Sequence, residues 1–181
     1  NAVDAAIAVS FALAVVNPSA GNLGGGGFML IHLSKINETI ALDYREKAPI
    51  KSFEKMFLDQ NEKVIKDLSL NSILASGVPG TVSGMFYASK KFGSMNIEKL
   101  ISPSIEIARN GFNLSEFQAK NLNKYREKFS KNIEAKQIFT KPNGFKKGDV
   151  LIQKNLADTL ERISKNGCLL YTSPSPRDVS T

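Results

Sequence analysis

Cysteine and histidine are scarce in this chain of 181 residues, which contains one of each, Cys168 and His32. A single cysteine excludes a disulfide-stabilised scaffold and leaves the redox compartment undetermined. His32 lies in an apolar run with no cysteine or carboxylate at metal-ligand spacing, so we expect a structural histidine and no metal centre. The 13 glycines and 7 prolines are too few for a collagen-like or low-complexity chain. The remaining composition, 42% hydrophobic and 23% charged, is globular and sufficient for about one domain.

The chain also lacks an apolar run long enough to cross a membrane. The stretch Ala5–Val16 is apolar except for Ser10 and stops at Asn17, whereas a membrane-spanning helix needs about 20 apolar residues. A secretory signal would carry basic residues before its apolar core, and the early charge here is Asp4. We therefore expect no stable membrane span. The run predicts a fully buried, alanine-rich helix that ends where Pro18 follows Asn17.

Acidic residues do not balance the basic ones, and the imbalance is local. Lys and Arg number 24 against 17 Asp and Glu, which gives a net charge of +7. Residues 1–85 carry 7 basic and 8 acidic side chains, whereas residues 86–154 carry 14 and 6. The excess is concentrated in nine side chains: Lys120, Lys124, Arg126, Lys128, Lys131, Lys136, Lys141, Lys146 and Lys147.

The apolar residues among these lysines follow the spacing of one helical stripe. They are Leu114, Phe117, Leu122, Tyr125, Phe129 and Ile133. The pattern predicts an amphipathic helix with its stripe in the core and its lysines in water. Arginine-rich base readers are lacking, as are aromatic residues on the charged face, so we expect no nucleic-acid partner. A non-catalytic basic binding module remains an alternative from a different functional class.

Two short apolar runs, Phe28–Leu33 and Thr39–Asp43, predict a pair of strands joined by a turn. They come directly after the buried helix, which indicates a sheet covered by helices. The second half of the chain is mostly helical in pattern. The composition and element order therefore predict the α/β (α+β) class.

Helices are predicted at Gly80–Phe92, Ile97–Ala108 and within Val150–Asn166. Pro103 either kinks the second of these helices or starts a new segment. Gly167 follows the last one in the position of a helix C-terminal cap. The sequence contains no recognisable internal repeat.

The glycine run Gly24–Gly27 lies between the buried helix and the first strand. A phosphate-binding loop requires the opposite order, with a strand before the glycines and a helix after them. Nucleotide binding is therefore not expected. The run instead predicts a backbone that passes close to another layer of the fold.

Arg45 follows the second predicted strand directly, at a sheet end where ligand-contacting groups are common. A guanidinium in that place could bind a substrate carboxylate bidentately, which a lysine cannot reproduce. A salt bridge to Asp43 or Glu46 is the structural alternative. Spacing alone does not separate the two interpretations.

Four motifs together resemble the large-subunit half of the bacterial γ-glutamyltranspeptidase (glutathione hydrolase) family. They are Asn1–Ala6, Gly21–Phe28, Asp43–Pro49 and Ala75–Gly84, in the family's order and at its distances. The resemblance extends to about Gly167. It implies an N-terminal-nucleophile hydrolase fold, an αββα sandwich of which only the large-subunit part is present in residues 1–167.

The resemblance also implies an activity. In the family the arginine of the third motif binds the α-carboxylate of the γ-glutamyl group, and at that position this chain has Arg45. A threonine freed by autoproteolysis attacks the γ-glutamyl carbonyl, and the acyl group passes to water or to an acceptor amino acid or peptide. The implied substrates are glutathione and other γ-glutamyl compounds, and no cofactor is implied. A related acylase of the cephalosporin or glutaryl type is the alternative.

No threonine of this chain begins the family's Thr-Thr-His-type segment, so we expect no catalytic residue here. The threonines are Thr39, Thr81, Thr140, Thr159, Thr172 and Thr181. The implied partner is the small subunit cut from the same precursor. We therefore expect this chain alone to be inactive and not to fold stably, because the exposed sheet edge would aggregate. By resemblance, the protein is periplasmic or secreted.

Residues 168–181 break the composition of the chain. Two interpretations are open: a proline- and serine-rich tail, or the translation of a sequencing-library adapter. We favour the adapter. On that interpretation the segment is not native, and Cys168 belongs to it.

Overall fold

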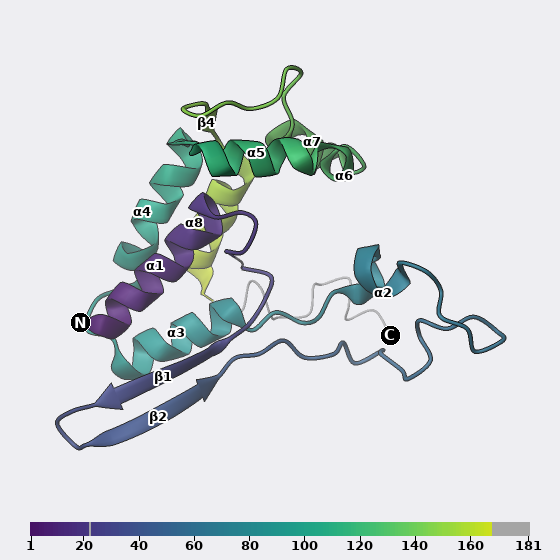
Figure 1. Ribbon diagram of the computed structural model, residues 1–181. Helices are drawn as coiled ribbons and strands as arrows, with labels where there is room; N and C mark the ends of the chain where they lie inside the picture. The colour runs from purple at the N-terminus through teal and green to yellow at the C-terminus, as the bar shows by residue number, and fades with distance from the viewer. Residues whose placement is uncertain (22, 168–181) are drawn as a thin grey trace.

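The computed structural model describes residues 1–21 and 23–167, in which helices predominate (Figure 1). The non-native segment expected at 168–181 lies outside the described residues. The helices are α1 (Ala2–Val16), α2 (Leu68–Asn71), the 3₁₀ turn η1 (Ile73–Ala75), α3 (Thr81–Phe92), α4 (Ile97–Asn110), α5 (Glu116–Lys124), α6 (Arg126–Phe129), α7 (Ile133–Phe139) and α8 (Lys154–Asn166). The strands are β1 (Phe28–Leu33), β2 (Glu38–Asp43), β3 (Phe112–Asn113) and β4 (Val150–Leu151).

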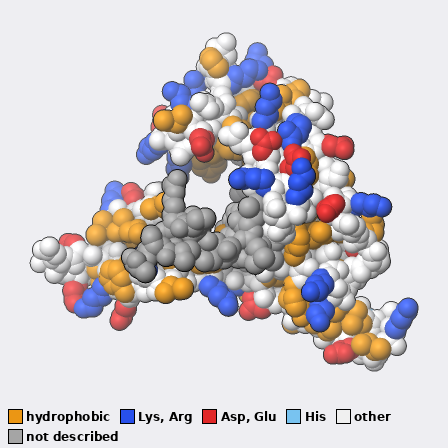
Figure 2. Space-filling model, turned by 180° about the vertical axis from the view of Figure 1, so that it is seen from behind, with side chains coloured by type: hydrophobic (Ala, Val, Ile, Leu, Met, Phe, Trp, Pro, Cys, Tyr) orange, Lys and Arg blue, Asp and Glu red, His pale blue; other side chains and the backbone are white. Residues whose placement is uncertain are grey.

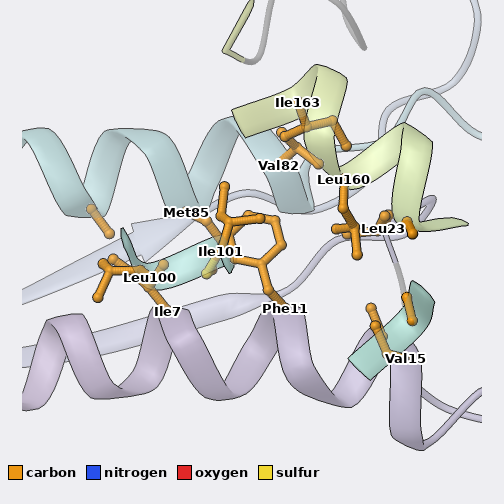
Figure 3. Close-up of a cluster of buried hydrophobic side chains, with 14 residues drawn as sticks. Ile7, Phe11, Val15, Leu23, Val82, Met85, Leu100, Ile101, Leu160 and Ile163 are labelled. Carbon is orange, nitrogen blue, oxygen red and sulfur yellow. The ribbon is translucent and has the colours of Figure 1, made fainter. Parts of the chain in front are cut away.

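The main hydrophobic core lies among α1, α3, α4 and α8 (Figure 3). Each helix contributes side chains at three- or four-residue spacing, which places them on one face. Its largest fully buried apolar members are Ile7, Phe11, Met85, Ile101, Leu160 and Ile163. The predicted helices at α3, α4 and α8 are confirmed. Helix α4 continues through Pro103, and Gly167 caps α8 with a φ of +71°.

Helix α1 is buried on one face within the described residues, so the expectation of a fully buried helix is wrong here. Ile7, Phe11 and Val15 are buried, whereas Val9 and Leu13 are exposed on the opposite side. A helix that is apolar all round has no polar face to indicate which side packs. The side of α1 that is buried is determined by the helices that pack against it, α3 and α4.

The start of α1 is fixed by two polar side chains. Asn1 caps the helix, and its side chain accepts hydrogen bonds from the backbone N–H groups of Val3 and Asp4. The buried Asp4 carboxylate accepts from the Ser94 hydroxyl at 2.6 Å and from the Ser94 backbone N–H at 3.1 Å. The Ser94 hydroxyl, followed by the backbone N–H groups of Ser94 and Met95, outweighs the effect of burial and lowers the pKa of Asp4 to about 2.

We expect Asp4→Asn to lower the melting temperature of the complete protein near neutral pH and to lose that effect in acid. The folded-state pKa lies below the ordinary value of 3.8, so the carboxylate stabilises the fold above about pH 4. That stability disappears as the pH falls through about 2. Melting curves of both proteins across this range test the expectation. Asp158→Asn, at an exposed carboxylate paired with Arg109, is the control and should change less. If the melting temperatures of the two proteins differed by the same amount at every pH, the proposed role of the Asp4 charge would be wrong.

Strands β1 and β2 form the predicted antiparallel hairpin, with Ile31 opposite Ile40. One face of the hairpin carries the buried Ile31 and packs Met29 and Leu42 on the core beside α3. Figure 1 shows α3 lying along this face. The other face is open, and Leu30 is 76% exposed on it. The prediction of a sheet covered by helices is therefore met on one face only among the described residues.

The segment 114–139 does not form one amphipathic helix, and that prediction is wrong. The chain breaks into α5, α6 and α7, and two residues of the expected core stripe, Phe117 and Ile133, are 72% and 77% exposed. The first interruption lies at Tyr125, between α5 and α6. At the second, the Asn132 side chain accepts a hydrogen bond from the Ala135 N–H and caps the start of α7. Leu114 and Leu122 are buried in a second, smaller core.

No helix in the described part of the chain combines the length and hydrophobicity needed to span a membrane.

Candidate functional site

Three of the four sequence motifs meet at one place in the fold, where β2 ends. The glycine run before β1, the segment Tyr44–Lys47 after β2 and the segment Val78–Gly84 at the start of α3 lie against one another. We call this contact region the junction. The remaining motif, at the start of α1, lies elsewhere and anchors the turn between α3 and α4 through Asp4.

Backbone hydrogen bonds hold the junction together. Tyr44 and Gly27 exchange two of them, at 3.0 and 3.4 Å, which extends the hairpin by one pair. Lys47 and Val78 exchange two more, at 3.2 and 2.8 Å. The carbonyl of Gly25 accepts from the backbone N–H of Gly80 at 2.8 Å, so that all three segments are connected. The path of the chain through residues 44–47 is therefore fixed from both sides.

The glycines of the junction permit contacts that no side chain would allow. A Cβ atom on Gly80 would lie 1.9 Å from the carbonyl oxygen of Tyr44, and one on Gly26 would lie 2.5 Å from it. The prediction that the glycine run lets the backbone pass close to another layer is thus confirmed at Gly26. Gly80 and Gly84 were not identified from the sequence as contact residues. Their four-residue spacing indicates that they lie on the same side of the chain, but it does not indicate that this side meets Tyr44.

The Tyr44 side chain fills the space that the glycines leave. Its ring is half-buried and packs on Gly27 and Gly84, and its hydroxyl donates to the Phe28 carbonyl at 3.5 Å. Burial raises the pKa of Tyr44. The residue before Arg45 is therefore packed into the fold.

Arg45 itself is exposed, and its backbone N–H donates to Asp43 Oδ1 at 2.9 Å. Within residues 1–21 and 23–167, its guanidinium group forms no ion pair, so the salt bridge to Asp43 or Glu46 is not formed. Arg45 lines two open grooves. One includes Ser83 and Tyr87 of α3, and the other includes Pro49, Ser52 and Phe57. The arrangement leaves a charged, planar donor at the surface, on a backbone that is held rigidly.

The other residues considered from the sequence have local partners. His32 is exposed, and its Nδ1 lies 3.1 Å from Thr39 Oγ1, as expected for a structural histidine. The hydroxyls of Thr140 and Thr159 donate to helix carbonyls four residues earlier. Among the residues with described positions, no three His, Cys, Asp or Glu side chains are grouped to hold a metal ion.

The basic segment forms a separate lobe, residues 112–151, where Lys and Arg side chains are frequent in Figure 2. An aromatic residue does share this charged surface, contrary to expectation. The nitrogens of Lys124 and Lys128 lie 5.4 and 5.7 Å from the centre of the partly exposed Tyr125 ring. The absence of a nucleic-acid partner stays a prediction.

The family model for γ-glutamyltranspeptidase matches residues 1–172. The chain belongs to the γ-glutamyltranspeptidase family. It is 50% identical to the glutathione hydrolase proenzyme of Escherichia coli, over 92% of this chain and 29% of that protein. It therefore spans less than a third of the length of this curated relative.

Solved structures of the γ-glutamyltranspeptidase family agree with this assignment. The Helicobacter pylori γ-glutamyltranspeptidase matches with a TM-score of 0.89 and 48% identity, over 93% of this chain and 49% of that one. A cephalosporin acylase from Bacillus halodurans matches with a TM-score of 0.76 but 21% identity, over 94% of this chain and 33% of that one, which shows a common fold alone. The predicted N-terminal-nucleophile hydrolase fold and α+β class are confirmed.

Proposed function

We propose that the complete protein cleaves the γ-glutamyl bond of glutathione and related compounds, and that Arg45 holds the α-carboxylate of the γ-glutamyl group. The observation that carries the proposal is the exposed guanidinium of Arg45 on the rigid junction, which forms no ion pair with any residue of 1–21 and 23–167. Two parallel N–H donors of a guanidinium match the two oxygens of a carboxylate. Asp43 forms no salt bridge with Arg45 within the described residues, and its Oδ1 accepts from the backbone N–H of Arg45.

The covalent chemistry in this proposal comes from residues outside this chain. A threonine freed by self-cleavage of the precursor attacks the γ-carbonyl carbon and forms an ester. The bond from that carbon to the amide nitrogen breaks, and the hydroxyl proton passes through the threonine α-amine to the leaving nitrogen. Water or an acceptor amine then takes the γ-glutamyl group. Arg45 contributes binding and orientation of the substrate.

The partner in this proposal is the small subunit from the same precursor. Exposed apolar side chains support it, because large contiguous apolar surfaces mark interaction sites. They occur on the open face of the hairpin, at Phe28 and Leu30, and along residues 48–76, which extend away from the core (Figures 1 and 2). Ile50 and Ile73 in that extension are almost fully exposed. The relative from Escherichia coli is named a proenzyme. Export to the periplasm or the exterior stays a prediction from the family resemblance.

Three chromogenic substrates test the proposal on the protein expressed from its complete reading frame. We expect γ-glutamyl-p-nitroanilide to be cleaved with the highest kcat/KM. The 4-aminobutyryl analogue lacks the α-carboxylate and should lose about 10- to 100-fold, the value of a hydrogen-bonded charge contact. The glutaryl analogue keeps a carboxylate and lacks the amine. A preference for it would identify an acylase of the cephalosporin or glutaryl type, and equal rates on the first two substrates would exclude the Arg45 contact.

A further inference from the structure

The ring of Tyr44 rests between two glycines that lie far apart in the sequence. A Cβ on Gly84 would lie 2.4 Å from Tyr44 Cγ and 2.6 Å from its Cβ. A Cβ on Gly27 would lie 3.0 Å from Cε2 of the same ring and 3.2 Å from its hydroxyl oxygen. Helix α3 therefore approaches the base of the Tyr44 side chain, and the end of the glycine run approaches its outer edge.

We propose that Gly84 is a positioning residue for carboxylate binding, because it seats Tyr44 and thereby sets the direction of Arg45. This inference rests on the proposed role of Arg45. Gly84 lies beneath the base of the Tyr44 side chain, and Tyr44 is joined directly to Arg45 by a peptide bond whose carbonyl oxygen belongs to Tyr44. The carbonyl of that peptide bond is the atom against which Gly80 and Gly26 pack.

A side chain at position 84 would have to move Tyr44, since the three atoms that it would meet, Cβ, Cγ and Cδ1, are all at or near the root of that side chain. A small rotation at residue 44 is carried along the chain to Arg45, and the long side chain of Arg45 enlarges the displacement at its guanidinium. The charge would remain near the substrate while the paired hydrogen-bond geometry is lost. Misplacement of a binding group by about 1 Å can cost up to a hundredfold in rate or affinity.

Gly93 provides a matched control at the other end of α3. A Cβ there would lie 2.6 Å from the Ser89 carbonyl oxygen and 2.8 Å from Asp4 Oδ1, so this position is comparably crowded. It contacts neither Tyr44 nor Arg45. Alanine at either glycine should therefore strain the same helix, and alanine at position 84 alone should disturb the junction.

The test compares Gly84→Ala with Gly93→Ala in the complete protein. We expect both to lower the melting temperature. Gly84→Ala should raise KM for γ-glutamyl-p-nitroanilide about tenfold with kcat within about twofold, whereas Gly93→Ala should leave KM unchanged. With the 4-aminobutyryl substrate, which has no α-carboxylate, Gly84→Ala should leave KM unchanged as well. An equal rise of KM on both substrates, or the same rise in Gly93→Ala, would overturn the inference.

Two further variants keep the outcomes separate. If Gly84→Ala does not fold, Gly27→Ala meets the ring at its edge and should give a smaller, equally carboxylate-specific rise of KM. Arg45→Ala tests the proposed function itself. If Arg45→Ala leaves KM unchanged, the proposed role of Arg45 is wrong. If Arg45→Ala raises KM while Gly84→Ala and Gly27→Ala leave it unchanged, Arg45 binds the substrate but the two glycines do not position it.

Discussion

Arg45→Ala in the complete protein should raise KM for γ-glutamyl-p-nitroanilide by about 10- to 100-fold. A hydrogen bond to a charged group contributes about 1.5–3 kcal/mol, and this contact includes the charge on both partners. The rise is expected in KM more than in kcat, because the α-carboxylate lies away from the bond that is cleaved and contributes binding before and during the reaction. Steady-state kinetics with both parameters resolved provide the measurement.

Two other variants make the result specific to the guanidinium. Arg45→Lys keeps the charge and loses the paired donors, so KM should be intermediate. Lys47→Ala removes a neighbouring cation of the same groove, while the backbone pair of Lys47 with Val78 is retained. Its KM should change by less than about threefold, as expected for an exposed charge. If KM rose equally in Arg45→Ala and Lys47→Ala, the overall positive charge of the groove, rather than a direct contact with Arg45, would attract the substrate.

Phe11→Ala should destabilise the fold more than any other change considered, by about 3–5 kcal/mol. Phe11 is 1% exposed at the centre of the core among α1, α3, α4 and α8. Truncation removes the transfer energy of the ring and leaves a cavity that close-packed helices cannot fill. Denaturant unfolding of the complete protein measures the loss.

The matched control is Phe117→Ala, since Phe117 is 72% exposed in this structure. A surface change of this kind should stay within about 0.5 kcal/mol. Phe11→Leu restores most of the volume and should cost less than Phe11→Ala. If Phe11→Ala and Phe117→Ala were equally destabilising, the position of the core given by the structure would be wrong.

Signals that act over a few residues were sufficient for the long helices α1, α3, α4 and α8 and for the hairpin of β1 and β2. The hairpin followed from two apolar runs and a turn, and the end of α8 followed from Gly167, which takes the positive φ that glycine adopts readily. The stripe through residues 114–133 failed, because apolar spacing continued through two helix ends, at Tyr125 and at Ser130, and Asn132 then caps a new helix. That prediction rested on periodicity alone.

The candidate site was predicted in part. Arg45 was identified from its place after a strand and from the family motif, with a salt bridge left open as the alternative. The structure excludes that bridge among the described residues, because Asp43 turns to the backbone N–H of Arg45. Tyr44, Gly80 and Gly84 were not singled out as contact residues. Their role depends on an approach between segments some forty residues apart, and a single sequence carries no direct signal of distance.

The sequence alone determined the class of the chain and the places of its long helices and its hairpin. The four motifs indicated the family, and the composition excluded a disulfide scaffold and a metal centre as expectations. These properties depend on composition and on the local preferences of the backbone. The tertiary structure alone decided which side of the uniformly apolar α1 faces the core, how Asp4 reaches Ser94, and why glycine is needed beneath Tyr44. Each of these depends on the packing of segments distant in sequence, where steric contact rather than local preference selects the arrangement.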